Sequence, residues 1–415
     1  MLNKKIALSL ALVCTTAMPA MAEKYIVYIG SYTDSPATST SKGVYAARFD
    51  TDKPETLEPL GLMAETVNPA YLTGSKDGKT LYVPNWQSPK LKNNELDTIS
   101  TFRIDRKTGK LSPLNIATVD GALPNEAITD RSGRVVVVVN YGSEVRVKNN
   151  AGVAVLKIMP DGKLADPFYV DIHPNEPIAT PPTARPGRGG RAGAAPAGPA
   201  PDPLANFGAH VHGIAFSTNN KFVFIADLGN DRIYSYKLDA SKPSMAPIAG
   251  TPYIHVGPNS GPRRMVVSPD GKILYCSYQD NAKTGVFKIA ANGALTLVQE
   301  IATVPADFKG GAGVAEIAID HAGNNLYVSN RGPSTIVHYA INKADGTLSI
   351  KDFTPSQGTS PRNLSVDATG KFLFVANQGS GDVVVFKMEA DGHLTFTGAK
   401  TTVSQAAGMF LVKAQ

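Results

Sequence analysis

The chain of 415 residues is 42% hydrophobic and 18% charged, and it contains 38 Gly and 30 Pro. Such a composition indicates a globular protein with a large core and an unusual number of turns. The formal net charge is only +6, and the basic residues are spread along the chain, which argues against a nucleic-acid or membrane-surface partner.

Residues 1–22 are typical of a cleavable signal peptide. Lys4 and Lys5 give a positive start, residues 6–13 form a short apolar stretch, and Ala20-Met21-Ala22 supplies small residues at a cleavage site. The apolar stretch is too short to span a bilayer. The sequence therefore predicts cleavage after Ala22 and a soluble periplasmic protein without stable membrane insertion.

Removal of this leader takes away two lysines and no acids, which lowers the formal net charge from +6 to +4. It also leaves Cys276 as the only cysteine, which excludes an intramolecular disulfide. Core packing has to hold the fold together.

The chain repeats a pattern of two apolar runs around a polar turn, followed by a third alternating run, a second turn and a fourth run. Turns such as Asp-Gly between alternating runs are a strong hairpin signal. The period of roughly 47–55 residues fits four-stranded propeller blades. Six whole copies begin with "NPAYLTGSKDGKTLYVPNW", "LPNEAITDRSGRVVVVVNYG", "FGAHVHGIAFSTNNKFVFIAD", "GPRRMVVSPDGKILYCSYQD", "GVAEIAIDHAGNNLYVSNRG" and "SPRNLSVDATGKFLFVANQG".

A seventh copy is split between the two ends of the chain. The segments "KYIVYIGSYT", "KGVYAARFD" and "TLEPLGLMAE" match strands two to four, and the C-terminal "AAGMFLVKA" matches strand one. Joining both ends in one blade would close the ring and remove exposed sheet edges. Residues 23–415 are thus predicted to form one all-β domain, a seven-bladed β-propeller with four antiparallel strands per blade.

An insertion rich in Pro, Gly, Ala and Arg is predicted at about residues 166–205, because this stretch lacks apolar periodicity. Its arginines raise the alternative of a nucleic-acid-binding arm, but no aromatic residues interleave with them, and no nucleic-acid partner is predicted. Smaller insertions follow Trp86 and Tyr141.

Alignment of the repeats on their Asp-Gly turns compares the residues at the start of each first strand. The first column contains Ala70, Asn125, His212, Arg263, Ala315 and Arg362, and the second contains Tyr71, Glu126, Gly213, Arg264, Glu316 and Asn363. First strands line the channel of a propeller, and their starts lie beside the ends of the antiparallel second strands. Those ends carry, among others, Asn140, Gln279, Arg331 and Asn377.

We expect these two sets to meet at one mouth of the channel and to recognise an anionic or polyhydroxylated small molecule, since arginine offers a planar fork to carboxylate or phosphate. A histidine or glutamate beside them could act as general base. The candidate catalytic residues are His212, His210 and Glu316. The candidate substrate-binding residues are Arg263, Arg264, Arg331, Arg362, Asn140, Gln279 and Asn377.

Other roles remain open for some of these residues. Polar residues at strand ends also bind backbone groups or channel water, above all the asparagines. The pair His210 and His212 could bind zinc, but no third ligand is marked by spacing, and neither a metal nor a cofactor is predicted.

The ordered series "YIGSYT", "HVHGIAFS", "ADLGNDRIYSY", "GPRR", "AEIAID", "VSNRG" and "SPRNLSVDATGKFLFVANQ" resembles the seven-bladed propeller lactonase family, with its 6-phosphogluconolactonases and carboxymuconate cycloisomerase. The resemblance implies cofactor-free lactone chemistry at the channel mouth. It also implies functional roles for His210 or His212, for Arg263 and for Arg331.

The chain departs from that family at two positions. Arg264 stands where the family usually has histidine, and Gln279 stands where many members have a glutamate with an acid–base role in the cycloisomerase branch. Glutamine cannot accept a proton in that role.

The sequence therefore predicts an exported lactonase, a monomer, acting on an unphosphorylated aldonolactone or another carboxylate-bearing lactone. The alternatives are a non-catalytic propeller that binds a ligand or acts as a scaffold, and a cycloisomerase acting on a dicarboxylate lactone.

Overall fold

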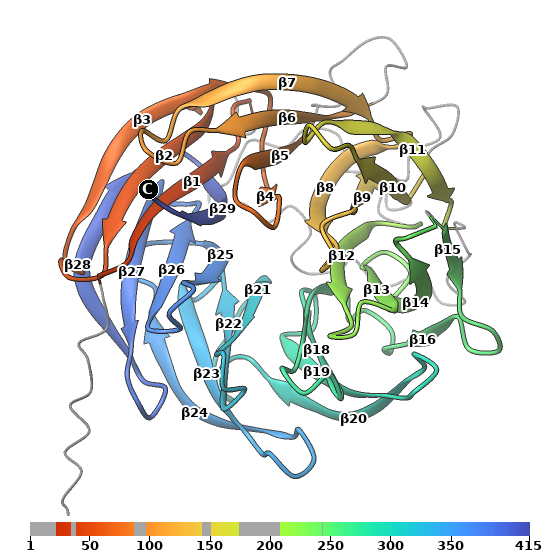
Figure 1. The fold of residues 1–415 in the computed structure, drawn as a ribbon. Helices are drawn as coiled ribbons and strands as arrows, with labels where there is room; N and C mark the ends of the chain where they lie inside the picture. The colour runs from red at the N-terminus through yellow and green to blue at the C-terminus, as the bar shows by residue number, and fades with distance from the viewer. Residues whose placement is uncertain (1–21, 35–38, 87–96, 143–150, 174–207, 243) are drawn as a thin grey trace, which may run out of the picture.

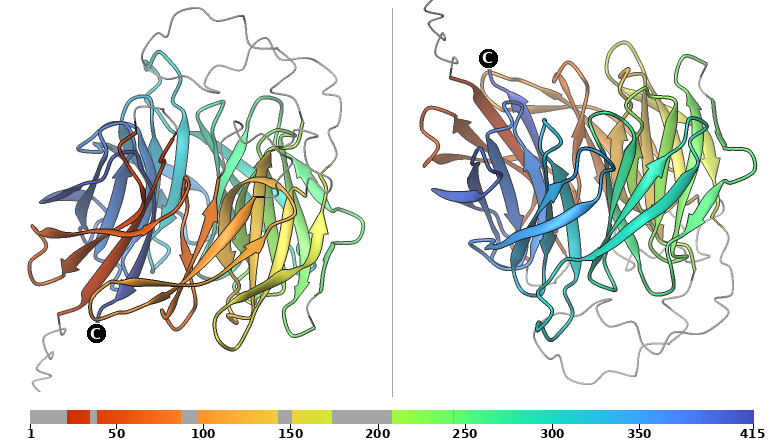
Figure 2. Two further views of the ribbon diagram at one scale, coloured as in Figure 1. Left: turned by 90° about the horizontal axis from the view of Figure 1, so that it is seen from above. Right: turned by 90° about the horizontal axis from the view of Figure 1, so that it is seen from below.

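The computed structural model describes residues 22–34, 39–86, 97–142, 151–173, 208–242 and 244–415, which form 29 strands and no helix (Figure 1). This part of the chain accordingly contains no helical segment that could cross a membrane. Seven antiparallel sheets stand around a centre, and Figure 2 shows their strands running between the two faces of a thick disc. The predicted seven-bladed propeller is confirmed.

Each blade contributes one sheet, in which the strands follow one another from the centre of the ring outwards. The strands are β29 (Ala406–Lys413), β1 (Lys24–Ser31), β2 (Gly43–Asp50) and β3 (Leu57–Glu65); β4 (Thr73–Gly74), β5 (Thr80–Asn85), β6 (Thr98–Ile104) and β7 (Leu111–Thr118); β8 (Ala122–Thr129), β9 (Val135–Gly142), β10 (Val153–Ile158) and β11 (Leu164–Asp171); β12 (Val211–Phe216), β13 (Phe222–Asp227), β14 (Arg232–Asp239), β15 (Ser244–Pro247) and β16 (Tyr253–His255); β17 (Pro262–Val267), β18 (Ile273–Tyr278), β19 (Lys283–Ile289) and β20 (Leu295–Ala302); β21 (Val314–Ile319), β22 (Asn325–Asn330), β23 (Thr335–Ile341) and β24 (Leu348–Pro355); β25 (Pro361–Val366), β26 (Phe372–Asn377), β27 (Asp382–Met388) and β28 (Leu394–Thr402).

The two ends of the chain share one blade, as the sequence predicts. Strand β29 is the first strand of the sheet β29-β1-β2-β3, and its register places Phe410 opposite Tyr28. The C-terminal strand thus occupies the inner edge of a sheet whose other strands come from the N-terminal segment.

The hydrophobic core lies between neighbouring sheets. The residues 135–139 of β9 are five successive valines, all fully buried, because both faces of this sheet are covered by the adjacent blades. Across another blade boundary, Phe49 packs edge-on against Phe372 and Phe374, with ring centroids 5.1 and 5.0 Å apart. This two-sided burial explains why second strands read as continuous apolar runs.

A hydrogen bond from a tyrosine in a second strand to a turn of the next blade recurs around the ring. The tyrosine hydroxyl donates to the carbonyl oxygen of a glycine between the third and fourth strands. Four such bonds are Tyr28 to Gly109 at 3.0 Å, Tyr82 to Gly162 at 3.1 Å, Tyr275 to Gly346 at 2.9 Å and Tyr327 to Gly392 at 2.7 Å. They fix four of the seven blades against the next at the face that carries these turns.

Two details differ from the expected pattern. The fourth strand of one blade is divided into β15 and β16, which both pair with β14, because prolines and Gly250 (φ +82°) interrupt the ladder between them. Residues 166–171, predicted to belong to the insertion, form part of the outer strand β11, whose residues are mostly partly exposed and show no alternation of apolar and polar side chains. Residues 174–205 of the predicted insertion lie outside the described residues.

First strands of neighbouring blades approach closely at the centre of the ring. A Cβ atom on Gly213 of β12 would lie 2.1 Å from the carbonyl oxygen of Arg263 on β17. Glycine at this position therefore allows the contact that sets His212 beside Arg263 and Arg264.

We expect Gly213→Ala to destabilise the protein by about 1–3 kcal/mol, because the added methyl group would overlap backbone that cannot move freely. Denaturant unfolding followed by circular dichroism measures the change. Gly311→Ala is the control, since a Cβ there would meet nothing within 4 Å and its φ is not positive. Equal midpoints for both variants would contradict this account of the contact.

Candidate functional site

The starts of first strands and the ends of second strands meet at one end of the ring's centre. Arg263, the second residue of β17, donates from Nη2 to the hydroxyl oxygen of Tyr71 at 3.1 Å, although the two residues are 192 positions apart. We call the group formed by Arg263, Arg264, Arg331 and Arg362 the basic mouth.

Gln279 joins two arginines of the basic mouth. Its Oε1 accepts hydrogen bonds from Nε of Arg263 and from Nη2 of Arg331, both at 3.0 Å. Its Nε2 donates to Asp280 at 3.5 Å, and Nε of Arg331 donates to the carbonyl oxygen of Gly313 at 2.8 Å. A neutral amide thus stands at the point where two guanidinium groups converge.

Arg264 is the one member of the basic mouth that the described carboxylates neutralise. It forms ion pairs with Glu126 and, at 3.6 Å from Nε, with Glu316, and its Cζ lies 3.6 Å from the ring centroid of Tyr71. Asn363 donates to Glu316 at 2.8 Å. Burial raises the pKa of Glu126 to about 7, although the charge of Arg264 acts in the opposite direction.

Arg362 closes the cluster on the side of the blade formed by the two chain ends. Its Nη2 donates to the hydroxyl of Tyr32 at 2.6 Å, and its Cζ lies 5.0 Å from the Tyr32 ring and 5.6 Å from the Tyr71 ring. Burial raises the pKa of Tyr32 to about 12, so this hydroxyl stays neutral.

Positive charge in the basic mouth is only partly balanced. In the described parts of the chain, no carboxylate lies within 4.0 Å of the guanidinium groups of Arg263, Arg331 or Arg362. Nη1 of Arg263 and Nε of Arg362 are buried and have no hydrogen-bond partner among the residues that the structure describes. Burial and then the charges of Arg263 and Arg362 lower the pKa of Arg331 to about 9. Buried cations without partners are unfavourable, so this arrangement suits an anionic ligand.

Tyr71 lies at the centre of the cluster and responds to its charge. Burial opposes ionisation of the phenol, but the guanidinium groups of Arg263, Arg264 and Arg362 outweigh it and lower the pKa to about 8. The phenol therefore ionises just above neutral pH, between the carboxyl of Glu126 with a pKa of about 7 and the guanidinium of Arg331 with a pKa of about 9.

The two histidines flank Tyr141: both lie at the start of β12, and Tyr141 lies on β9 of the preceding blade. The His210 ring stacks on Tyr141 with centroids 4.6 Å apart, and the His212 ring meets the same tyrosine edge-on at 5.7 Å. Burial first, and then the charges of the neighbouring arginines, hold the pKa of His212 well below its usual value, so its ring is neutral at pH 7.

The structure does not bring Asn140 and Asn377 into the basic mouth. Nδ2 of Asn140 donates to the carbonyl oxygens of Val119 and Ala151, and Nδ2 of Asn377 donates to the carbonyl oxygen of Ser356 and to the carboxylate of Asp382. Both asparagines instead tie the end of a second strand to neighbouring backbone, the alternative noted for this residue type.

Tyr71, Glu126 and Asn125 belong to the site but were not among the residues selected from the sequence. They stand in the same repeat columns as Arg264, Glu316 and His212, so the alignment held the signal. The selection missed a tyrosine between arginines, a glutamate paired with Arg264 and an asparagine against a histidine, because residue type alone does not show these contacts.

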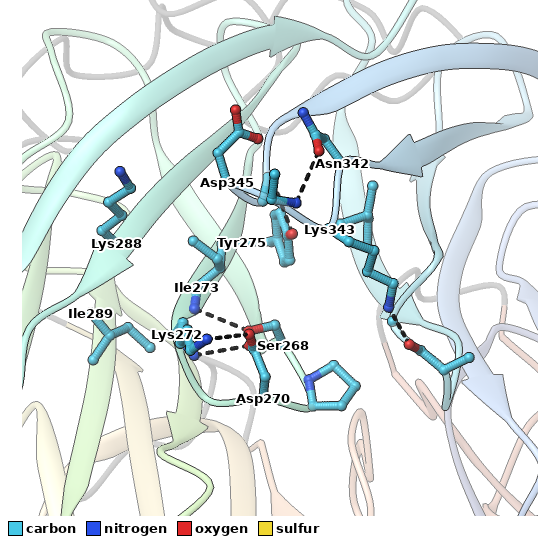
Figure 3. A pocket seen from close by; sticks show the side chains of 16 residues that line it. Ser268, Asp270, Lys272, Ile273, Tyr275, Lys288, Ile289, Asn342, Lys343 and Asp345 are labelled. Carbon is cyan, nitrogen blue, oxygen red and sulfur yellow. Dashed lines mark hydrogen bonds and ion pairs between the residues drawn. The ribbon is translucent and has the colours of Figure 1, made fainter.

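A surface cavity of about 420 Å³ lies elsewhere, between the blades of β17–β20 and β21–β24 (Figure 3). It is lined by turns that join first to second and third to fourth strands, so it belongs to the opposite ends of the strands from the basic mouth. Its lysines are engaged locally: Lys272 pairs with Asp270 at 3.7 Å, and Nζ of Lys343 donates to the carbonyl oxygen of Ala322. Within the described residues, no group of three or more His, Cys, Asp or Glu side chains is arranged to hold a metal ion.

Comparison with known proteins agrees with this geometry. A 6-phosphogluconolactonase of Formosa agariphila is 28% identical over 88% of this chain and 93% of its own length, and one of Bacillus subtilis is 26% identical over 92% and 96%. The solved structure of a periplasmic gluconolactonase of Pseudomonas aeruginosa is similar with a TM-score of 0.79 and 26% identity, covering 94% of this chain and 100% of that one.

The family model described as "Lactonase, 7-bladed beta-propeller" matches residues 26–411, nearly the whole of the propeller. The two bacterial relatives are lactone-hydrolysing enzymes by name, and they extend over the same blades. The chain belongs to the seven-bladed β-propeller lactonase family, and its named relatives indicate a lactone hydrolase.

Proposed function

We propose that this protein is an exported lactonase whose basic mouth hydrolyses a sugar lactone that carries an acid group of its own. The observation that carries the proposal is the pair of arginines, Arg263 and Arg331, held together by the neutral amide of Gln279. Two guanidinium groups without a neutralising carboxylate favour a carboxylate or phosphate between them.

The charge balance also bears on which lactone fits. Four guanidinium groups face two carboxylates, Glu126 and Glu316, so the mouth holds more positive charge than a single developing oxyanion needs. A lactone with a carboxylate or phosphate substituent would supply the missing negative charge before reaction begins. The names of the curated relatives agree with this, since 6-phosphogluconolactone carries a phosphate.

Hydrolysis needs three things from the protein: fixation of the lactone, a proton acceptor for the attacking water, and donors for the oxyanion that forms on the carbonyl oxygen. The arginines of the basic mouth supply the first. His210, His212 and Glu316 are the candidates for proton transfer and oxyanion binding. Collapse of the tetrahedral intermediate breaks the ring C–O bond, and the leaving alkoxide takes up a proton, which yields a hydroxy acid.

The function is tested by pH-stat hydrolysis of a lactone panel containing glucono-1,5-lactone, its 6-phosphate and a muconolactone. We expect acid release above background that is fastest with a lactone bearing an acid group. Arg331→Ala should raise KM about 10- to 100-fold with little loss of folding, as expected for one charge-assisted contact. Gln279→Glu should raise KM as well, because a carboxylate would neutralise both arginines.

Lys272→Ala is the matched control, since it also removes one positive charge but lies at the opposite ends of the strands. Equal changes in KM for Lys272→Ala and Arg331→Ala would show that the basic mouth is not the substrate-binding site. If the folded wild-type protein releases no acid from any lactone of the panel, a non-catalytic ligand-binding propeller is favoured.

Anion binding should weaken as the pH rises above 8, because ionisation of Tyr71 adds a negative charge among the arginines. The dissociation constant of sulfate, whose own charge is constant in this range, should increase about fourfold from pH 7 to 8.5 as the neutral phenol is lost. Isothermal titration calorimetry measures it, and Tyr71→Phe should show a smaller change. The same pH dependence in both proteins would assign the titration to another group.

Export is proposed from residues 1–22 and is consistent with the periplasmic relative of known structure. Expression of the full chain in a bacterium should deliver protein to the periplasmic fraction, with Glu23 as its first residue by N-terminal sequencing. A chain lacking residues 2–22 should remain in the cytoplasm. An uncleaved protein in the cytoplasmic fraction would contradict export.

A further inference from the structure

We propose that Asn125 is a positioning residue that holds His212 with its proton on Nε2, so that His212 donates a hydrogen bond to the lactone carbonyl oxygen and does not act as the base. This inference rests on the proposed function and assigns one step of it.

The amide of Asn125 makes two contacts with one residue. Its Nδ2 lies 3.0 Å from the carbonyl oxygen of His212 and 2.8 Å from Nδ1 of the same histidine. Asn125 is on β8 and His212 on β12, the first strands of adjacent blades, and both side chains are buried. Water therefore does not replace these bonds.

The orientation of the amide follows from the carbonyl contact. A carbonyl oxygen only accepts hydrogen bonds, so the amide atom 3.0 Å from it must be the nitrogen, because the amide oxygen there would face another oxygen. One hydrogen of the NH₂ group goes to this carbonyl, and the other points at Nδ1 of His212. Nδ1 must then accept, and in a neutral imidazole the proton is on Nε2.

The same contact disfavours a protonated ring. An imidazolium would direct an N–H at Nδ1 towards the N–H of Asn125, and it would add a cation near Arg263, Arg264 and Arg362. Within the described residues Nε2 of His212 forms no hydrogen bond. Its N–H can therefore serve a ligand.

His210 shows the opposite arrangement. Its Nδ1 lies 2.8 Å from the carbonyl oxygen of Tyr141, so this nitrogen carries the hydrogen and the lone pair of the neutral ring is on Nε2. The two histidines that flank Tyr141 thus differ in tautomer: His212 has a donor at Nε2, and His210 an acceptor.

Oxyanion binding and proton transfer are therefore assigned to different residues. Water oxygen bonds to the carbonyl carbon while its proton passes to a base other than His212, for which His210 and Glu316 are the candidates, and Nε2–H of His212 donates to the oxyanion. When the ring C–O bond breaks, the proton returns from that base to the leaving oxygen. No further reactant is needed.

The direct test is ¹⁵N NMR of the full mature chain labelled at histidine, with the signals of His212 identified by their loss in His212→Gln. We expect an acceptor-type Nδ1 and a protonated Nε2 that persist from pH 5.5 to 8.5. Asn125→Asp should reverse the tautomer, because a carboxylate accepts from Nδ1–H. A wild-type His212 with its proton on Nδ1, or a mixture of both tautomers, would overturn the proposal.

Activity gives a second test that does not depend on the fold of the Asn125 variant. The amide of glutamine can donate a hydrogen bond but cannot accept the proton of water. His212→Gln should therefore retain at least about ten times the kcat of His212→Ala, which should lose roughly 10²–10³-fold as oxyanion-donor variants do. Equal loss in both variants would assign His212 to the base. Correct tautomers in a protein that hydrolyses no lactone would reject the proposed function and leave the positioning role of Asn125 intact.

Discussion

Antiparallel pairing of the first and second strands is the constraint on which the site depends. Because the chain reverses between them, the start of one strand lies beside the end of the other, and seven blades deliver fourteen such points to one end of the ring's centre. Arg263 at the start of β17 and Gln279 just after β18 meet for this reason. The tyrosine-to-glycine bonds between blades and the buried aromatic contacts keep these points in fixed relation.

The four arginines of the basic mouth bring like charges together and are neutralised to different degrees. Arg264 is compensated by Glu126, Glu316 and the face of Tyr71, whereas the side chain of its neighbour Arg263 has only an amide and a phenol as hydrogen-bond partners within the described segments. Burial of these groups without full compensation is unfavourable for folding and favourable for binding an anion, since the ligand supplies the interactions that the chain leaves unmade. The stability of the blades elsewhere has to offset it.

The repeat and its turns were sufficient to predict the propeller and the shared blade, because strand period and hairpin turns are local properties. They also placed Arg263, Arg331 and Gln279 at one mouth. What sequence could not provide was contact across blades: Asn125 meets His212 over 87 residues, and Arg362 meets Tyr32 over 330. The backbone bonds of Asn140 and Asn377 and the tautomers of the histidines depend likewise on distances between atoms, which residue types alone do not fix.

The pairing of β29 with β1 has a consequence for the way this chain reaches its native state. The last blade cannot form until its C-terminal strand has been made, so the ring stays open throughout synthesis, and its closure brings together segments from the two ends of the sequence. Until then the inner edge of β1 has no partner strand. Pairing of β29 with β1 is therefore a late, long-range step of folding that removes this exposed sheet edge.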